Sequence, residues 1–241
     1  MDMHISGSGK IPAGEYESIS ISGSGRLYGL VRCTSLGISG SAHGESVACS
    51  GNIRISGSGH FDRDVQANCL TVSGSANVGG DIIAAQEVRL AGGVQCSGSI
   101  KTGTLNAAGG LSVGSDMEAE TAHVHGAVSC QGLLNAETVE IEMEGQSKIG
   151  SIGGSKILIY PKNSNPKKQR LSLFAKLSGK HREARVEQSI EGDEIALINV
   201  ICPRVSGRIV AVGEGCEIEL LQYSEKYEIH EKAKVGKIEK I

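Results

Sequence analysis

The chain has 241 residues and a formal net charge of −3, a length that suits one large domain or two ordinary ones. Hydrophobic residues make up 39% of it but aromatic residues only 3%, while glycine contributes 34 residues. So few large side chains argue against the core of an ordinary globular enzyme and favour thin, stacked layers. No long apolar run predicts a membrane-spanning helix, and the first residues carry no secretory signal. We therefore expect a cytoplasmic protein.

A short Ser-Gly motif recurs at fixed spacing from the start of the chain. It is ISGSG at residues 5–9, 21–25 and 55–59, ISGSA at 38–42, and VSGSA at 72–76. Its apolar first residue keeps its phase where the motif weakens, so that nine anchor positions can be followed: Ile5, Ile21, Ile38, Ile55, Val72, Leu90, Ala107, Val124 and Ile141. The spacing is 16 to 18 residues, most often 17. A short fixed period is typical of a solenoid.

Each repeat predicts a short strand followed by a corner. Another apolar residue stands two positions before an anchor, as Ile19 does before Ile21, and the residue between them is mostly polar. This alternation predicts a strand with one buried face. A third apolar residue stands six positions after the anchor. We interpret the Ser-Gly step as a corner, and we expect glycines that follow strands, such as Gly80 and Gly98, to supply positive φ.

A unit of about 17 residues cannot bury its own inner face, whereas stacking it on the next unit does so. The sequence therefore predicts an all-β fold, a parallel β-helix solenoid whose coils have about 17 residues and three sides. We expect the right-handed form, because a left-handed hexapeptide helix would give a strict 18-residue coil. The expected organisation is a Ser/Gly-repeat β-helix over 1–160, a basic insertion or loop over 161–189, and further coils with a C-terminal cap over 190–241.

The positive charge of the chain is concentrated in one segment. Residues 161–186 hold eight Lys or Arg and one acid, whereas the net charge is −6 before them and −4 after them. Three alternatives remain open: a solvated loop, an amphipathic patch on an anionic membrane, or a contact with an acidic partner. Base stacking is disfavoured by a single aromatic residue, so no nucleic acid is expected. The membrane or partner candidates are Lys167, Lys168, Arg170, Leu171, Phe174, Lys176, Leu177, Lys180 and Arg182.

Neither the acidic residues nor the ISGSG motif, which resembles a phosphate loop in its glycines, provides a clear catalytic group. Asp62 and Asp64 would face the same side of a strand, a spacing that suits a metal ion or an acid–base pair, although a solvated face is far more common. In the first ISGSG copy Lys10 follows Gly9, but Ile11 and Pro12 come next in place of the hydroxyl residue and helix that a phosphate loop requires. We expect no catalytic residue, no cofactor and no metal ion.

The histidines and cysteines lead to the same expectation. His43 and His60 occupy the same slot, five residues after their anchors, which we interpret as an outward polar column. His123 and His125 could ligate a metal ion, but no third ligand is evident. The seven cysteines include no CxxC pair, which indicates free thiols, and Cys96 and Cys130 are predicted to lie in the core.

The Ser-Gly repeats of 17 residues, with an apolar pair before each Ser-Gly, resemble the bactofilins, bacterial polymer-forming cytoskeletal proteins. The resemblance covers residues 5–160 and, more weakly, 190–241. It implies a right-handed β-helix that polymerises end to end without nucleotide, as a homopolymer or with a paralogous bactofilin. It also implies a scaffold in cell shape, cell-envelope organisation or motility, in the cytoplasm and in contact with the membrane.

Elementary physics also favours assembly, because the ends of a β-helix expose unpaired backbone groups and open apolar layers. Only four residues precede the first anchor, so we expect the N-terminal coil to be open. The candidate polymer contacts are Ile5, Ile19, Ile21, Ile229, Val235 and Ile238. Two other classes of function remain: a β-helix enzyme acting on carbohydrate, which needs a groove with convergent acids, and an adaptor that docks through the basic segment.

Overall fold

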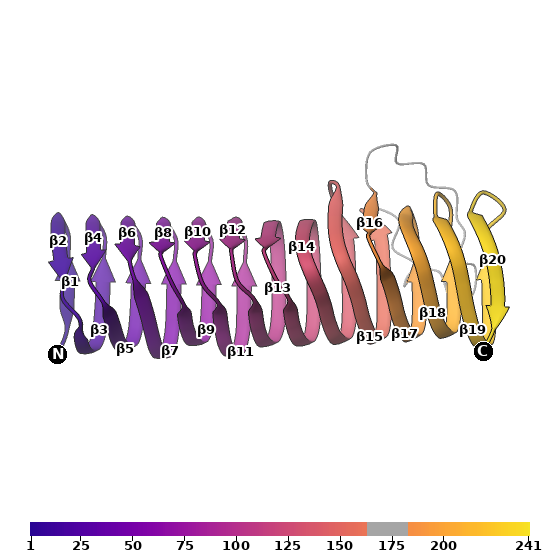
Figure 1. The fold of residues 1–241 in the computed structure, drawn as a ribbon. Coiled ribbons are helices and arrows are strands. Elements are labelled where there is room, and N and C mark those ends of the chain that lie inside the picture. Colours follow the sequence, from indigo (N-terminus) through magenta and orange to yellow (C-terminus); the bar gives the residue numbers. More distant parts are fainter. Residues whose placement is uncertain (163–182) are drawn as a thin grey trace. The chain divides into compact units, whose positions relative to one another are not determined.

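A computed structural model describes residues 1–162 and 183–241 of the chain (Figure 1). The regular secondary structure of these residues is β-strand, and their strands pair in parallel. This confirms the predicted all-β parallel solenoid. None of the described residues forms a helix that is long and apolar enough to cross a membrane. The backbone divides into two compact units, Met1–Ala119 (unit 1) and Glu120–Ile241 (unit 2).

Unit 1 alternates long and short strands. The column of long strands starts with the three-residue β1 (Met3–Ile5) and continues with β3 (Gly14–Ile21), β5 (Leu30–Ile38), β7 (Ser46–Ile55), β9 (Val65–Val72), β11 (Ile82–Leu90) and β13 (Ile100–Val113). The short strands are β2 (Ser8–Ile11), β4 (Ser24–Leu27), β6 (Ser41–Gly44), β8 (Ser58–Phe61), β10 (Ser75–Val78) and β12 (Gly93–Cys96). Each long strand pairs with the next long strand and each short strand with the next short one, and β13 serves both columns. Register shifts inside strands such as β5 and β7 bend the long side, so each turn has three faces.

The register places the predicted anchors directly over one another. Ile5 pairs with Ile21, Ile21 with Ile38, and Ile38 with Ile55, and the series continues to Ala107. All of these anchors are buried, and so are the apolar residues six positions after them where the slot is apolar. A spacing of 17 residues therefore corresponds to one turn, and burial of the inward side chains is the main stabilising contribution.

The Ser-Gly corner needs glycine because successive turns approach each other closely there. A Cβ atom on Gly57 would lie 2.0 Å from the carbonyl oxygen of Gly40 in the preceding turn, and Gly40 meets Gly23 in the same way. Gly7, in the first turn, has no atom within 4 Å of its Cβ position. The expectation of positive φ is wrong for Gly80 and Gly98. A Cβ on these two residues would instead collide with an Asp carboxylate of the preceding turn, at 2.1 and 2.2 Å.

Unit 2 continues with longer strands and no Ser-Gly motif. Its strands are β14 (Met117–Met143, from Glu120 on), β15 (Ser147–Pro161), β16 (Ala184–Val186), β17 (Ser189–Leu197), β18 (Val200–Val212), β19 (Glu217–Ile229) and β20 (Lys234–Lys240). Paired residues are 18 apart between Ile141 and Ile159 but 38 apart between Ile159 and Leu197. The basic segment thus lengthens a single turn, and strand pairing resumes on β15 after it.

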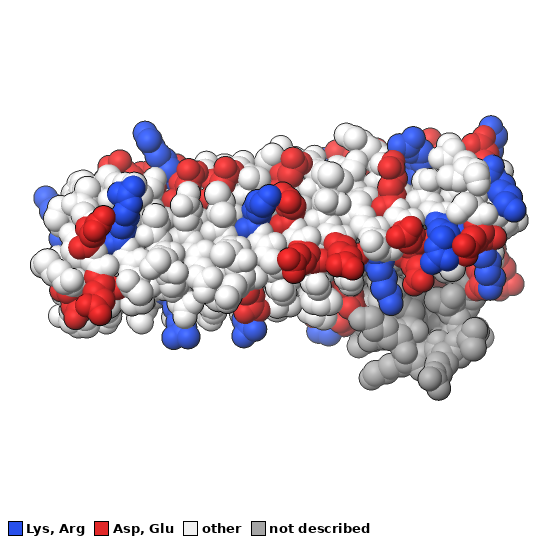
Figure 2. Space-filling model, turned by 90° about the horizontal axis from the view of Figure 1, so that it is seen from below, with Lys and Arg blue, Asp and Glu red and all other residues white. Residues whose placement is uncertain are grey.

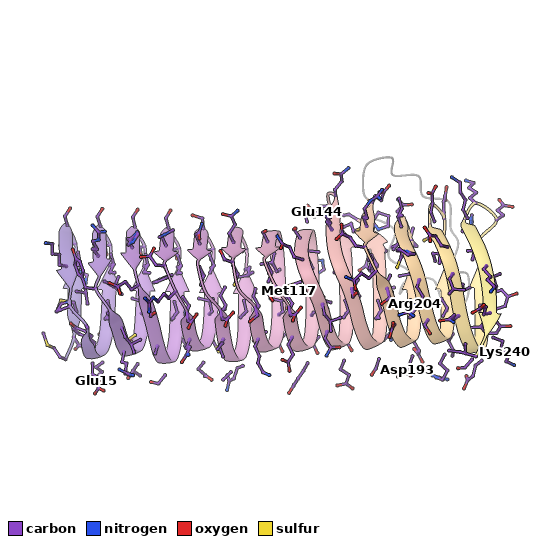
Figure 3. The ribbon with its side chains drawn as sticks, in the orientation of Figure 1. Glu15, Met117, Glu144, Asp193, Arg204 and Lys240 are labelled. Carbon is purple, nitrogen blue, oxygen red and sulfur yellow. The ribbon has the colours of Figure 1, made fainter. Side chains whose placement is uncertain are left out.

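β20, the last strand of unit 2, pairs in the same way as the strands before it. β20 pairs in parallel with β19, Ile218 with Val235 and Leu221 with Ile238. The predicted capping turn at 235–238 therefore has the backbone of another strand. Side chains follow the same inside–outside rule in both units: Met117 of unit 1 is buried, whereas Glu15 of unit 1 and Asp193 of unit 2 point away from the ribbon (Figure 3).

Candidate functional site

The first turn of unit 1 presents an open sheet edge. In the described residues β1 pairs with β3 and β2 with β4, and neither has a strand on its other side. The carbonyls of Gly7 and Ile11 accept hydrogen bonds from Ser24 and Tyr28 of the second turn. Since alternate residues of a parallel strand address opposite neighbours, the backbone groups of Ser8 and Lys10 point to the open edge.

The apolar residues proposed as polymer contacts lie just behind this edge. Ile5 belongs to the first turn and is 7% exposed. Ile19 and Ile21 belong to β3, in the second turn, and are buried beneath the first. A partner strand would therefore meet the backbone of β1 and β2 and the apolar layer around Ile5, and would reach Ile19 and Ile21 only through that turn.

Unit 2 has a sheet edge of its own at β20, which is more charged than the edge of the first turn. Within the described residues β20 pairs only with β19. It carries Lys234, Lys237 and Lys240, and lysines on an edge strand disfavour further pairing. Of the candidates at this end, Ile229 and Val235 are half-buried and Ile238 is 42% exposed. This edge combines an accessible apolar side chain with a positively charged rim.

A column of polar side chains runs along the outside of the short strands. Its successive members are Lys10, Arg26, His43, His60, Asn77, Gln95 and Ser112. The rings of His43 and His60 stack with their centroids 4.7 Å apart. Asp62 accepts a hydrogen bond from His43 Nε2 at 3.2 Å and another from His60 Nε2 at 3.1 Å.

The predicted column is therefore present, but the histidines in it converge on a carboxylate. Asp62 was missed as their partner because it lies in the bend after β8, outside the strand pattern. The sequence does contain a signal for this group. Two consecutive repeats carry histidine in the same slot, His43 and His60, and Asp62 follows the second histidine by two residues.

Asp62 and Asp64 do not form the expected pair on a strand, because both lie in the bend between β8 and β9. Asp64 Oδ1 accepts a hydrogen bond from the backbone N–H of Asp81 at 2.9 Å. Asp81 Oδ1 in turn accepts bonds from the backbone N–H and the hydroxyl of Ser99, at 2.7 and 2.8 Å. These bonds lower the pKa of Asp81. The two carboxylates link successive turns at a corner.

In unit 2, His123 and His125 each face a carboxylate of the next turn. His123 Nδ1 lies 3.4 Å from Glu140, and His125 Nδ1 lies 3.0 Å from Glu142. Glu140 is buried and accepts a 2.8 Å hydrogen bond from the Tyr160 hydroxyl. Burial, followed by this bond, raises the pKa of Tyr160. The two histidines thus belong to separate His–carboxylate contacts.

A groove of about 800 Å³ lies on unit 2 along β16, β18, β19 and β20. Three carboxylates line it, those of Glu187, Glu217 and Glu219. Two of them are engaged by lysines, Glu217 by Lys234 at 2.6 Å and Glu187 by Lys148 at 2.9 Å. Glycoside hydrolysis uses two carboxyl groups on either side of the scissile bond, whereas two of the three carboxylates here are held in ion pairs with lysine.

Six of the seven cysteines are buried, and Cys69 is half-buried. Cys96 and Cys130 lie in the core as predicted. Cys33 and Cys49 are register partners in successive turns. Their shared hydrogen bond lowers the pKa of Cys49 to about 7 and raises that of Cys33. The nine basic and apolar candidates between Lys167 and Arg182 lie outside the described residues.

No protein-family model matches the chain, and no solved structure matches it. The chain is similar to the "Uncharacterized protein YhbF" of Bacillus subtilis (strain 168), with 32% identity over 98 residues. The aligned stretch is 40% of this chain and 37% of that protein, so it spans well under two thirds of the relative's length. The geometry of the edges and outer columns is therefore the basis for assigning a function.

Proposed function

We propose that this protein is a bactofilin-like, non-enzymatic cytoskeletal scaffold that assembles end to end without nucleotide. The observation that carries the proposal is the open edge of β1 and β2, each paired on one side only in the described residues. Unpaired N–H and C=O groups on a sheet edge are a template for another strand. A second copy that presents the same kind of edge would continue the solenoid ladder.

Two further features support assembly at this edge. The corner of the first turn is free, because nothing lies within 4 Å of the Cβ position of Gly7, whereas every later Ser-Gly corner is closed by the turn before it. The lysines of β20 make the other edge less favourable for the first contact. We therefore place one polymer contact at the N-terminal turn. The partners are other copies of this chain or a paralogous bactofilin.

The proposal extends to cellular role only through the resemblance of the repeats to the bactofilins. On that basis the filament acts in the cytoplasm, in peripheral contact with the membrane, and supports cell shape, cell-envelope organisation or motility. The basic segment supplies the expected membrane or partner contact, and deletion of residues 163–182 should release the protein from the membrane while filaments still form.

The edge can be blocked without disturbing the turn behind it. Lys10→Pro removes a backbone N–H that points to the open edge, and proline is tolerated on edge strands. Lys10→Ala removes the same side chain and keeps that N–H, so it is the matched control. Electron microscopy should show filaments for the wild type and Lys10→Ala, and few or none for Lys10→Pro, with unchanged β-sheet circular dichroism. Filaments of equal length in all three proteins would reject this contact.

A further inference from the structure

We infer that His43, His60 and Asp62 form a binding site for one divalent cation of the zinc class. The Nε2 atoms of the two histidines and a carboxylate oxygen of Asp62 lie within 4.8 Å of one another. Two imidazoles and one carboxylate are a ligand set typical of zinc sites that keep a position open for water. Oxygen-preferring cations such as Mg²⁺ are disfavoured by this set.

The distances suit coordination with small adjustments. Zinc bonds of about 2.0–2.1 Å in tetrahedral geometry place two ligand atoms about 3.4 Å apart. His43 Nε2 is now 3.2 Å from Oδ2 of Asp62, and His60 Nε2 is 3.1 Å from the other oxygen, Oδ1. A cation held between them replaces the two hydrogen bonds, and the proton on each Nε2 moves to Nδ1 or to solvent. Rotation of the Asp62 carboxylate supplies the remaining space.

The backbone fixes all three ligands in place. His43 in β6 and His60 in β8 are direct register partners, so their side chains leave successive turns side by side. The N–H of Asp62 donates to the carbonyl of Gly44 at 2.9 Å, and the N–H of Arg63 donates to the carbonyl of Glu45 at 2.8 Å. Ligands mounted on strands and on a bonded bend lose little freedom when an ion binds.

The neighbouring side chains in the polar column contact residues other than the three proposed ligands. The Arg26 guanidinium lies over the ring of Tyr28, 5.7 Å from its centroid, and Lys10 is drawn to the same ring. On the other side, Asn77 donates to Gln95 at 3.3 Å. The three ligand side chains are 44 to 48% exposed, so water completes the coordination shell and ions can enter from solvent.

The site also has a structural consequence, because its ligands come from two successive turns of unit 1. A bound ion would cross-link β6 and β8 on their outer face. Any ligand that binds only the folded state stabilises it by mass action. The unfolding temperature of the wild type should therefore rise with Zn²⁺ and fall back on addition of a chelator, and hydrogen exchange should slow in β6 and β8.

The test is isothermal titration of the full-length, tag-free chain with Zn²⁺, with Mg²⁺ as the control ion. The wild type should bind one Zn²⁺ and show no heat with Mg²⁺. His43→Gln, His60→Gln and Asp62→Asn should each weaken binding at least tenfold, since even outer-shell changes cost about 10–100-fold. His125→Gln is the matched control, because it removes a histidine that faces a single carboxylate, and it should bind as the wild type does.

A second measurement separates this site from the thiols. Co²⁺ replaces Zn²⁺ in such sites and reports its ligands by absorption. Nitrogen and oxygen ligation without a sulfur-to-metal charge-transfer band supports the proposal. A strong charge-transfer band, no binding by the wild type, or binding as tight as that of the wild type in all three ligand variants would each overturn it.

Discussion

Unit 1 and unit 2 share the same parallel strand pairing but differ in how their outer surfaces connect one turn to the next. Unit 1 holds only 7 of the 24 Lys and Arg residues and 10 of the 27 Asp and Glu residues. Its corners are built from glycines that pack against carbonyl oxygens and from Asp carboxylates that accept backbone N–H groups. Closely packed contacts of this kind demand the same small residue in every turn.

Ion pairs between turns are more frequent in the described residues of unit 2, although unit 1 also has a Lys–Glu pair of this kind, between Lys101 and Glu118 at 2.9 Å. Arg204 pairs with Glu191 at 2.7 Å and Arg208 with Glu225 at 2.8 Å, and Lys162 pairs with Glu144 at the turn labelled in Figure 3. Figure 2 shows the difference on one face, where unit 2 carries more red and blue side chains than unit 1. Long charged side chains tolerate changes of spacing, so the register spacing falls to 15 between Leu197 and Val212. The repeat is therefore clear in the sequence of unit 1 and can be followed in unit 2 only as far as Ile141, although the strand pairing is the same in both units.

The largest expected effect is at a closed corner of unit 1. In Gly57→Ala the new Cβ would lie 2.0 Å from a backbone oxygen that no rotamer change can move, so the turns must separate. We expect a loss of about 3 kcal/mol or more in the free energy of unfolding, at the upper end for overpacking, measured by urea denaturation. Gly7→Ala is the matched control, because its corner is open, and it should change stability by about 0.5 kcal/mol or less. Equal effects would contradict the packing explanation.

The next effect tests the buried polar contact of unit 2. Tyr160→Phe removes the 2.8 Å bond to Glu140 and leaves a buried carboxylate with one donor fewer. We expect a loss of about 1.5–3 kcal/mol, the range for hydrogen bonds to charged groups. Hydrogen exchange by mass spectrometry should localise the change to β14 and β15. Tyr28→Phe, at a 38% exposed tyrosine of unit 1, should be close to neutral, and a comparable loss there would refute this interpretation.

A smaller, pH-dependent effect is expected at the carboxylate corner of unit 1. The bonds from Ser99 lower the pKa of Asp81, so its contribution is present above the unfolded pKa of about 3.9 and is lost as the pH falls through the folded value. Asp81→Asn should lose about 0.5–1.5 kcal/mol at pH 7. The difference from the wild type should shrink as the pH falls below the unfolded pKa and through the lowered folded value of Asp81. A difference that does not vary with pH would rule out this role for the carboxylate.

The smallest effect is expected for the ion pairs of unit 2. Arg208→Ala breaks two pairs, with Glu194 and Glu225, whose side chains are 40 to 57% exposed. Exposed pairs contribute about 0–1 kcal/mol, and salt screens them. Urea denaturation should therefore show a loss below about 1 kcal/mol that disappears in 1 M NaCl. A loss that persists at high salt would point to packing of the arginine stem.

The solenoid could be predicted from the sequence because the anchors recur along the chain at a nearly constant spacing. Inward residues such as Ile21 and Ile38 must stack in register, so their spacing is the length of a turn. The reason for the corner glycine was not predictable, since the oxygen that excludes a Cβ at Gly57 belongs to another turn. The His43–His60–Asp62 group was missed for a related reason: strand alternation says which residues face outward but not which bend residue reaches them.

We propose that the open N-terminal turn of unit 1 makes this chain a self-assembling scaffold. Electron microscopy of the purified full-length protein, without nucleotide and over a range of salt and protein concentrations, tests it most directly. We expect filaments whose number rises with protein concentration. Lys10→Pro should suppress them, whereas Lys10→Ala should not. Wild-type protein that stays monomeric under all of these conditions would contradict it.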